Sequence, residues 1–125
     1  MTPDRPNILL LMTDQQRWDS LGIYGCDCAY TPNLDRLGAE GLVFDACTAN
    51  NPICTPSRAS LMTGKHLPGH KVYRLYDDLP DDQVCFTKHL QRHGYQAALF
   101  GKLHVNSKDY EHRQRHPHDG FDIHE

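Results

Sequence analysis

The segment from Asn51 to Gly64 most constrains the fold, because it contains the signals for the start and the end of a short helix. Pro56 favours the first turn of a helix, where its fixed φ angle and missing N–H cost nothing, and Gly64 favours a helix end. Cys54 then lies just ahead of the helix N-terminus, and Arg58 follows one turn later. An anion held there would meet unpaired N–H groups, the positive end of the helix dipole and a bidentate guanidinium donor. The segment predicts an anion site beside a thiol, although a buried cysteine before a structural helix would give the same pattern.

Strand and helix patterns alternate along the chain. Strands are predicted at residues 7–13, 42–48 and 95–100, and helices at residues 32–40, 56–63 and 82–93. The first of these runs is continuously apolar, which is typical of a strand covered on both faces of a parallel sheet. The alternation predicts an α/β fold in which a mainly parallel sheet is sandwiched by helices. At 125 residues, the chain has the length of one domain.

Polar side chains follow two of the predicted strands. Asp14 stands at the carboxyl end of the first strand with Gln15 beside it, and Lys102 and His104 alternate after the strand at 95–100. Ligands collect outside the carboxyl ends of the strands in open α/β sheets. Hard cations such as Ca²⁺ take oxygen ligands, so Asp14 and Gln15 are candidate metal ligands. Taken singly, Asp14 could cap the next segment and the Gly-Lys-x-His segment could be an ordinary turn.

The remaining segments are predicted to pack or to be solvated. Thr31 is expected to cap the first helix, with Leu34 and Leu37 pointing inward, and Asp81 or Asp82 is expected to cap the last. Residues 64–79 lack periodicity, which predicts a surface loop. The late histidines are also expected in solvated loop rather than in a metal site; they are His104, His112, His116, His118 and His124.

Charge and cysteine usage exclude some classes of protein. The net charge is -3 and the basic residues are scattered, which argues against nucleic acid as a partner. The longest apolar run, Ile8 to Met12, is too short to span a membrane. Five cysteines form no regular framework and no apolar signal segment precedes Asn7, so we expect free thiols and a cytoplasmic location. Cys26-x-Cys28 has no second cysteine pair and is expected to be incidental rather than metal-binding.

Three of these motifs together resemble the type I sulfatases, whose signature cysteine is oxidised to formylglycine. The signature matches Cys-Thr-Pro-Ser-Arg-Ala-Ser-Leu-Met-Thr-Gly at residues 54–64. Pro6 to Asp14 resembles the first strand and metal aspartate of the family, and Gly101 to His104 resembles its Gly-Lys-x-His motif. The enzymes of the family are several times longer. The resemblance therefore implies an alkaline-phosphatase-like fold of which residues 1–125 are the incomplete N-terminal part of one catalytic domain, with no second domain.

The resemblance also implies a chemistry. Cys54, oxidised by a maturation enzyme and hydrated, would attack sulfur with one hydroxyl and expel sulfate through the other. Asp14, Gln15 and the modified residue 54 would hold Ca²⁺ or another divalent cation. Arg58 would orient the diol, Lys102 would bind the sulfate ester, and His104 would act as base. Two departures from the family pattern are Gln15, where a second aspartate is usual, and Leu103, where tryptophan is usual.

Three functions remain open from the sequence. The first is a sulfatase acting on a small sulfate ester, for which we expect negligible activity from the 125-residue chain without the missing C-terminal portion. The second is a phosphonate monoester or phosphodiester hydrolase of the same superfamily, which often has a non-acidic residue after the metal aspartate. The third is a non-catalytic truncated module.

Overall fold

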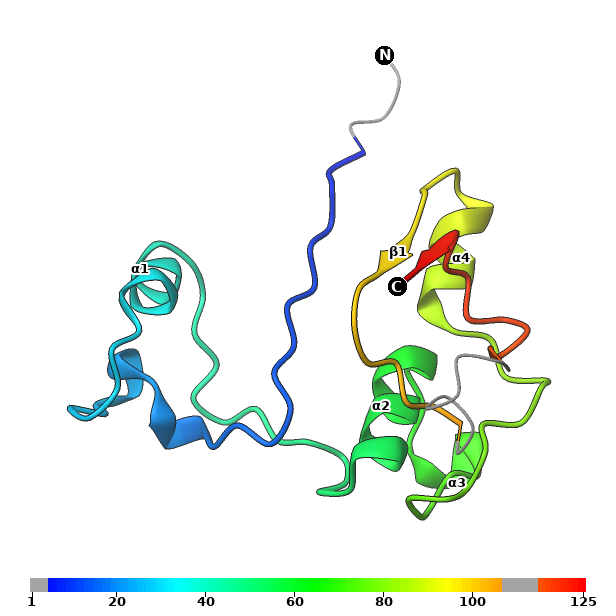
Figure 1. Ribbon diagram of the computed structural model, residues 1–125, viewed down its shortest axis with the longest axis horizontal. Coiled ribbons are helices and arrows are strands. Elements are labelled where there is room, and N and C mark those ends of the chain that lie inside the picture. Colours follow the sequence, from blue (N-terminus) through cyan, green and yellow to red (C-terminus); the bar gives the residue numbers. More distant parts are fainter. Residues whose placement is uncertain (1–4, 107–114) are drawn as a thin grey trace. The chain divides into compact units, whose positions relative to one another are not determined.

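The computed structural model describes residues 5–106 and 115–125, and it divides into two compact units (Figure 1). The first unit, Met1–Cys47, contains the 3₁₀ helices η1 (Trp18–Ser20) and η2 (Gly22–Tyr24) and helix α1 (Pro32–Glu40). The second unit, Thr48–Glu125, contains α2 (Cys54–Thr63), α3 (Leu67–His70), α4 (Phe86–Arg92), β1 (Ala98–Leu99) and β2 (Ile123–His124). In the described ranges, no helix has the length and apolar character needed to cross a membrane.

Helix α1 has the predicted bounds, but its first residues are held differently from the prediction. Thr31 makes no capping hydrogen bond to the helix. Instead, its hydroxyl accepts the Gly22 N–H at 2.9 Å and donates to the Asp35 carboxylate at 3.0 Å. Asp35 also accepts the Ile23 N–H at 2.8 Å. These bonds tie the start of α1 to η2, so Thr31 joins two elements rather than capping one.

The packing face of α1 also differs from the prediction. Leu34 and Leu37, expected to point inward, are 41% and 61% exposed. The close contact with η2 is made at Gly38, where an added Cβ would overlap the Ile23 side chain. The missing side chain of Gly38 therefore lets Ile23 approach the helix.

Two of the predicted strands are not strands in the described residues. Residues 7–13 and 42–48 have no regular secondary structure, and the apolar side chains from Ile8 to Met12 are 47% to 80% exposed. A strand makes no hydrogen bonds within itself and needs an adjacent strand. No strand of the described chain pairs with either segment, and this explains why an apolar run can lack the expected structure.

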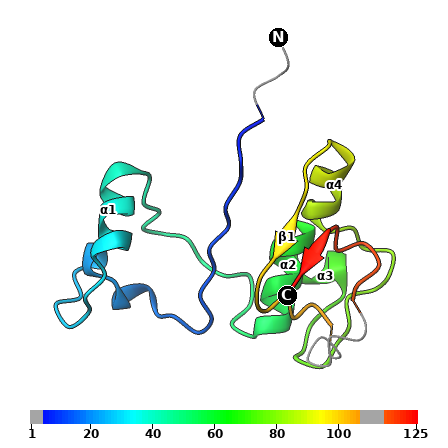
Figure 2. The ribbon, with the colours of Figure 1, turned by 45° about the horizontal axis from the view of Figure 1, so that its top comes forward.

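The strand predicted at residues 95–100 is confirmed in shorter form as β1. It pairs in parallel with β2, which the sequence did not predict, with Ala98 opposite Ile123 and Leu99 opposite His124. Figures 1 and 2 both show the two strands side by side in the second unit. The parallel pair with its neighbouring helices confirms the α/β class, present here as a partial sheet.

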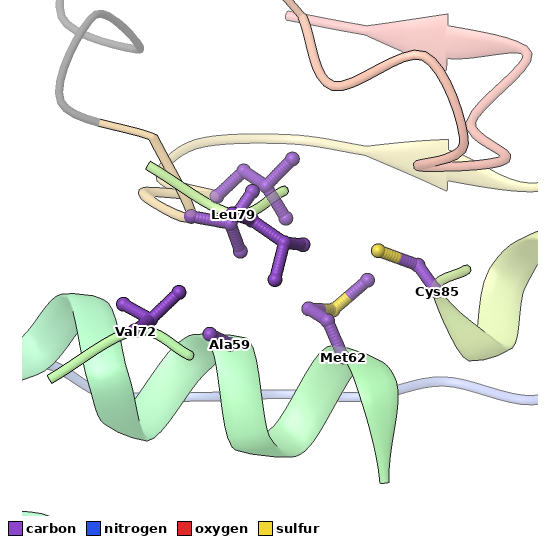
Figure 3. Close-up of a cluster of buried hydrophobic side chains, with 7 residues drawn as sticks. Ala59, Met62, Val72, Leu79 and Cys85 are labelled. Carbon is purple, nitrogen blue, oxygen red and sulfur yellow. The ribbon is translucent and has the colours of Figure 1, made fainter. Parts of the chain in front are cut away.

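The core of the second unit lies where α2 packs against the segments that follow it (Figure 3). Its buried apolar residues are Ala59, Met62, Val72, Leu79, Cys85, Leu103 and Val105. Helix α4 begins at Phe86, four residues later than the earliest predicted start. The Cys85 N–H donates to the carbonyl of His118 at 3.1 Å, and the Gln83 N–H closes a turn on Pro80 at 2.9 Å. These bonds hold the preceding residues in a turn, so neither Asp81 nor Asp82 caps the helix.

Residues 64–79 are not the predicted surface loop. They include α3 and three buried side chains, His70, Val72 and Leu79. His70 Nδ1 accepts the Val72 N–H at 3.1 Å, so Nε2 carries the proton that is donated to Ser60 Oγ at 2.9 Å. Burial lowers the pKa of His70, which favours this neutral form.

The prediction of solvated late histidines is also wrong for two of them. His104 and His116 are 2% and 1% exposed. His116 Nδ1 accepts the His118 N–H at 3.2 Å, and Nε2 donates to the Pro80 carbonyl at 3.0 Å. His112 lies outside the described residues. Because both ring nitrogens of His116 bond to backbone groups, it fastens the C-terminal segment to the turn before α4.

Gly120, Phe121 and Asp122 act together to hold β2 in place. The Asp122 carboxylate accepts the Ala97 N–H at 2.8 Å and the Gln91 side-chain amide at 2.7 Å. Phe121 packs against the core, and Gly120 has a φ of 76° next to the first turn of α4. The role of this segment in the structure is therefore to join β2 to β1 and α4.

Candidate active site

Cys54 is the first residue of α2, which begins two residues before the predicted start at Pro56, so the thiol lies at the helix N-terminus, within the helix rather than just ahead of it. The Asn51 side chain accepts the Ile53 N–H at 2.8 Å and forms the turn that leads into the helix. Ile53 has extended backbone angles, and its carbonyl accepts the Ser57 N–H at 3.1 Å as the first helical bond. Cys54 is half-buried. The turn and the helix start therefore present residue 54 next to unpaired N–H groups.

Arg58 connects the helix start to the predicted Gly-Lys-x-His segment. Its side chain is 7% exposed, and Nη1 donates to the backbone carbonyl of Lys102, which lies 44 residues further along the chain. The Lys102 side chain is exposed. The contact brings two of the three sequence motifs to the same end of α2.

His104 is held against the helix through Thr55. The Thr55 hydroxyl donates to the Leu75 carbonyl at 2.9 Å, so its oxygen is an acceptor for His104 Nε2 at 3.4 Å. Thr55 is fully buried, and His104 has a φ of 54°, in the left-handed region that non-glycine residues rarely adopt. Residues in such conformations persist where their surroundings hold them, and they concentrate at functional sites. The His104 ring therefore contacts Thr55, the residue that directly follows Cys54 in α2.

Four of the predicted site residues therefore belong to one place in the second unit: Cys54, Arg58, Lys102 and His104. Sequence reasoning missed Thr55, because its partner His104 is 49 residues away and no local pattern links them. The contacts that bring these residues together are made by the Arg58 side chain, the Lys102 backbone carbonyl and the His104 ring. The start of a helix and a guanidinium are both features that favour a negatively charged group.

Asp14 and Gln15 belong to the first unit, and their membership of the site stays a prediction. Both are exposed, and Gln15 has a φ of 59°. Their side-chain oxygens fit the preference of Ca²⁺ for oxygen ligands. Across residues 5–106 and 115–125, no group of three or more His, Cys, Asp or Glu could hold a metal. Both residues offer the oxygen donors that calcium prefers. Calcium takes roughly six to eight ligands, so these two residues would supply only part of the set.

Comparisons with known proteins agree with the motifs. The family model described as Sulfatase matches residues 6–123. N-acetylgalactosamine-6-sulfatase of Homo sapiens is 37% identical over 96% of this chain and 25% of its own length. N-acetylglucosamine-6-O-sulfatase of Bacteroides thetaiotaomicron is 40% identical over 83% of this chain and 19% of its own length.

A solved structure gives the same result for the fold. It is the crystal structure of yidJ from Bacteroides fragilis, a protein assigned to the sulfatases, with a TM-score of 0.74 and 29% identity. The match covers 87% of this chain and 28% of the other. The chain spans about a quarter, 25%, of the length of the N-acetylgalactosamine-6-sulfatases that it matches. With the family model covering nearly all of its residues, this chain belongs to the sulfatase family.

Proposed function

We propose that the protein to which this chain belongs hydrolyses sulfate esters, with Cys54 as the precursor of its nucleophile. The observation that carries the proposal is the bond from Arg58 to the Lys102 carbonyl. It joins the helix of the cysteine motif to the Gly-Lys-x-His motif, and this contact supports the proposal. A sulfate monoester is an anion, so a site that hydrolyses it needs fixed positive charge around the reacting group.

Residue 54 supplies the nucleophile in this proposal. After oxidation by a maturation enzyme to formylglycine, its hydrate would provide one hydroxyl for attack on sulfur and a second for release of the sulfate. The half-buried position at the start of α2 keeps the residue reachable by substrate while the helix dipole favours negative charge beside it. Asn51 sets the turn that presents it.

The other site residues would each have a separate role in the reaction. Arg58 is buried and fixed by the Lys102 carbonyl, so its charge would orient residue 54 without rearrangement during the reaction. The exposed Lys102 ammonium would bind the incoming sulfate group. His104 would transfer the proton at position 54, and Thr55 fixes the ring by accepting from its Nε2. By the family resemblance, Asp14 and Gln15 would hold Ca²⁺ or another divalent cation, which would supply positive charge for an anionic substrate.

The test is hydrolysis of an aryl sulfate by the full-length protein, produced together with a formylglycine-forming enzyme. Cys54→Ala should abolish turnover, and Lys102→Ala should lower kcat/KM by roughly 10²- to 10³-fold, the usual cost of one preorganised donor. Arg92→Ala removes an exposed cation at the end of α4 and is the matched control that should remain active. Unchanged turnover by Cys54→Ala would refute the proposal.

The substrate class needs a second comparison. The names of two relatives, N-acetylgalactosamine-6-sulfatase and N-acetylglucosamine-6-O-sulfatase, make 6-sulfated amino sugars the first natural substrates to assay. An aryl phosphonate monoester should be assayed in parallel. A higher kcat/KM for the phosphonate than for the sulfate would assign the protein to the other branch of the superfamily.

A further inference from the structure

Cys26 and Cys28 form a pair of thiols that the proposed hydrolase chemistry does not use. Their sulfur atoms are 3.0 Å apart and share a hydrogen bond. Cys28 is exposed and Cys26 is half-buried, so a small molecule in solution can reach the pair. The other free cysteines of the described chain are Cys47, Cys54 and Cys85. None of these three has a thiol partner there.

The loop that carries the pair is fastened at both ends. Gly22 donates its N–H to Thr31 Oγ1 at 2.9 Å, and Ile23 donates to Asp35 at 2.8 Å. Gly25 adopts a φ of 86°, which lets the chain turn directly before Cys26. The Cys26 N–H donates to the Leu21 carbonyl at 3.2 Å. Because the fold already holds the loop ends together, part of the entropy cost of joining the two sulfurs is met before they react.

We propose that Cys26 and Cys28 are a thiol–disulfide exchange site that takes a small-molecule disulfide as oxidant and forms a reversible internal disulfide. An S–S bond is about 2.0 Å long, so the sulfurs must approach by roughly 1 Å. One residue separates the cysteines, and a bond across so small and exposed a ring belongs to the labile, readily reduced class of disulfides.

The chemistry balances with one disulfide molecule. The Cys26 thiolate attacks one sulfur of the oxidant, the S–S bond breaks, and one thiolate leaves with the electron pair. The Cys28 thiolate then attacks the Cys26 sulfur of the mixed disulfide and releases the second thiolate. Two protein thiols are oxidised, one disulfide is reduced to two thiols, and both protons pass to the released thiolates.

Electrostatics gives the two cysteines different roles. The hydrogen bond from Cys28 lowers the pKa of Cys26, and backbone N–H groups of Cys28 and Ala29 act in the same direction. The same thiol–thiol bond raises the pKa of Cys28, and the Asp19 charge opposes ionisation of both. The attacking thiol is the one that ionises more readily, so Cys26 attacks first and Cys28 resolves the mixed disulfide.

The experiment uses glutathione disulfide as the probe and mass spectrometry of tryptic peptides after acid quenching. Cleavage after Arg17 and Arg36 gives a peptide whose two cysteines are Cys26 and Cys28. In the native protein this peptide should lose the mass of two hydrogen atoms. In Cys28→Ser it should instead retain one glutathione on Cys26. Cys47→Ser is the matched control, which removes an exposed thiol elsewhere and should leave the disulfide unchanged.

A second measurement separates the folded site from any flexible Cys-x-Cys segment. The equilibrium between dithiol and disulfide in glutathione buffers should favour the disulfide at least about tenfold more in the native protein than in the urea-unfolded chain. Cys85, buried with its pKa raised to about 12, is an internal standard that should stay reduced in the native protein. Equal equilibria in the two states, or a peptide from Cys28→Ser that stays free of glutathione, would overturn the proposal.

Discussion

Gly120→Ala should destabilise the second unit strongly, because two costs coincide at this position. Gly120 has a φ of 76°, a conformation that costs an L-residue roughly 1 kcal/mol. An added Cβ would also lie 2.5 Å from Lys88 Cα and 2.6 Å from the Thr87 carbonyl carbon. These are backbone atoms of α4, and overpacking of this kind costs about 1 to 3 kcal/mol.

The overlap could be relieved if the loop around Gly120 moved away from α4, but two hydrogen bonds oppose this movement. The Thr87 hydroxyl donates to the Asp119 carbonyl, and the Cys85 N–H donates to the His118 carbonyl at 3.1 Å. If the loop moved away from α4, these bonds would stretch, and each contributes about 1 kcal/mol. We therefore expect Gly120→Ala to lower the free energy of unfolding by about 3 kcal/mol.

Gly64→Ala is the matched control for the backbone cost alone. Gly64 ends α2 with a φ of 67°, and nothing lies within 4 Å of an added Cβ. The expected loss is about 1 kcal/mol. Urea unfolding should be followed by far-UV circular dichroism, since Trp18 belongs to the other unit. If the two variants differed by less than about 0.5 kcal/mol, the overlap argument would be wrong.

Three further outcomes follow from the same geometry. The pKa of His70 is lowered from 6.5 by burial, so its contribution to stability should be complete above pH 6.5 and should decline as pH falls below it; His70→Gln should remove this dependence in urea titrations at several pH values. Thr55→Val keeps the side-chain shape but removes the acceptor for His104, so it should lower kcat about tenfold with KM nearly unchanged, whereas Thr55→Ser should retain activity. Asp122→Ala should speed hydrogen exchange at the Ala97 amide, whose acceptor it removes, while Asp122→Asn, which keeps an acceptor oxygen, should protect it better.

Helices α1 and α2 were predictable because their signals are local. Pro32 and Gly41 bracket α1 as expected, and Gly64 ends α2 with a left-handed residue. Each signal depends on the preferred backbone angles of a single residue. The first strand was not predictable in the same way, since an apolar run shows that a segment can be buried but not that a partner strand is present. Residues 7–13 have the composition of a strand and lack such a partner in the described chain.

The candidate site was only partly predictable for a related reason. Cys54 and Arg58 are four positions apart in one helix, so their proximity follows from helix geometry. The contacts that Lys102 and His104 make with α2 cross 44 and 49 residues, and they depend on how α2 packs against that later segment. Sequence resemblance supplied this link, while local spacing could not.

The geometry also changes the role that the sequence alone would give to Arg58. From the spacing, Arg58 is a bidentate guanidinium donor for an anion at the helix start. In the structure it is 7% exposed and bonds to a backbone carbonyl, so it also determines where the Lys102 segment lies. A lysine would keep the positive charge, but it would lose the planar array of donors of a guanidinium. Under the proposed function, Arg58 would therefore have two tasks, to position the Lys102 segment and to orient residue 54, and the two together favour arginine over lysine.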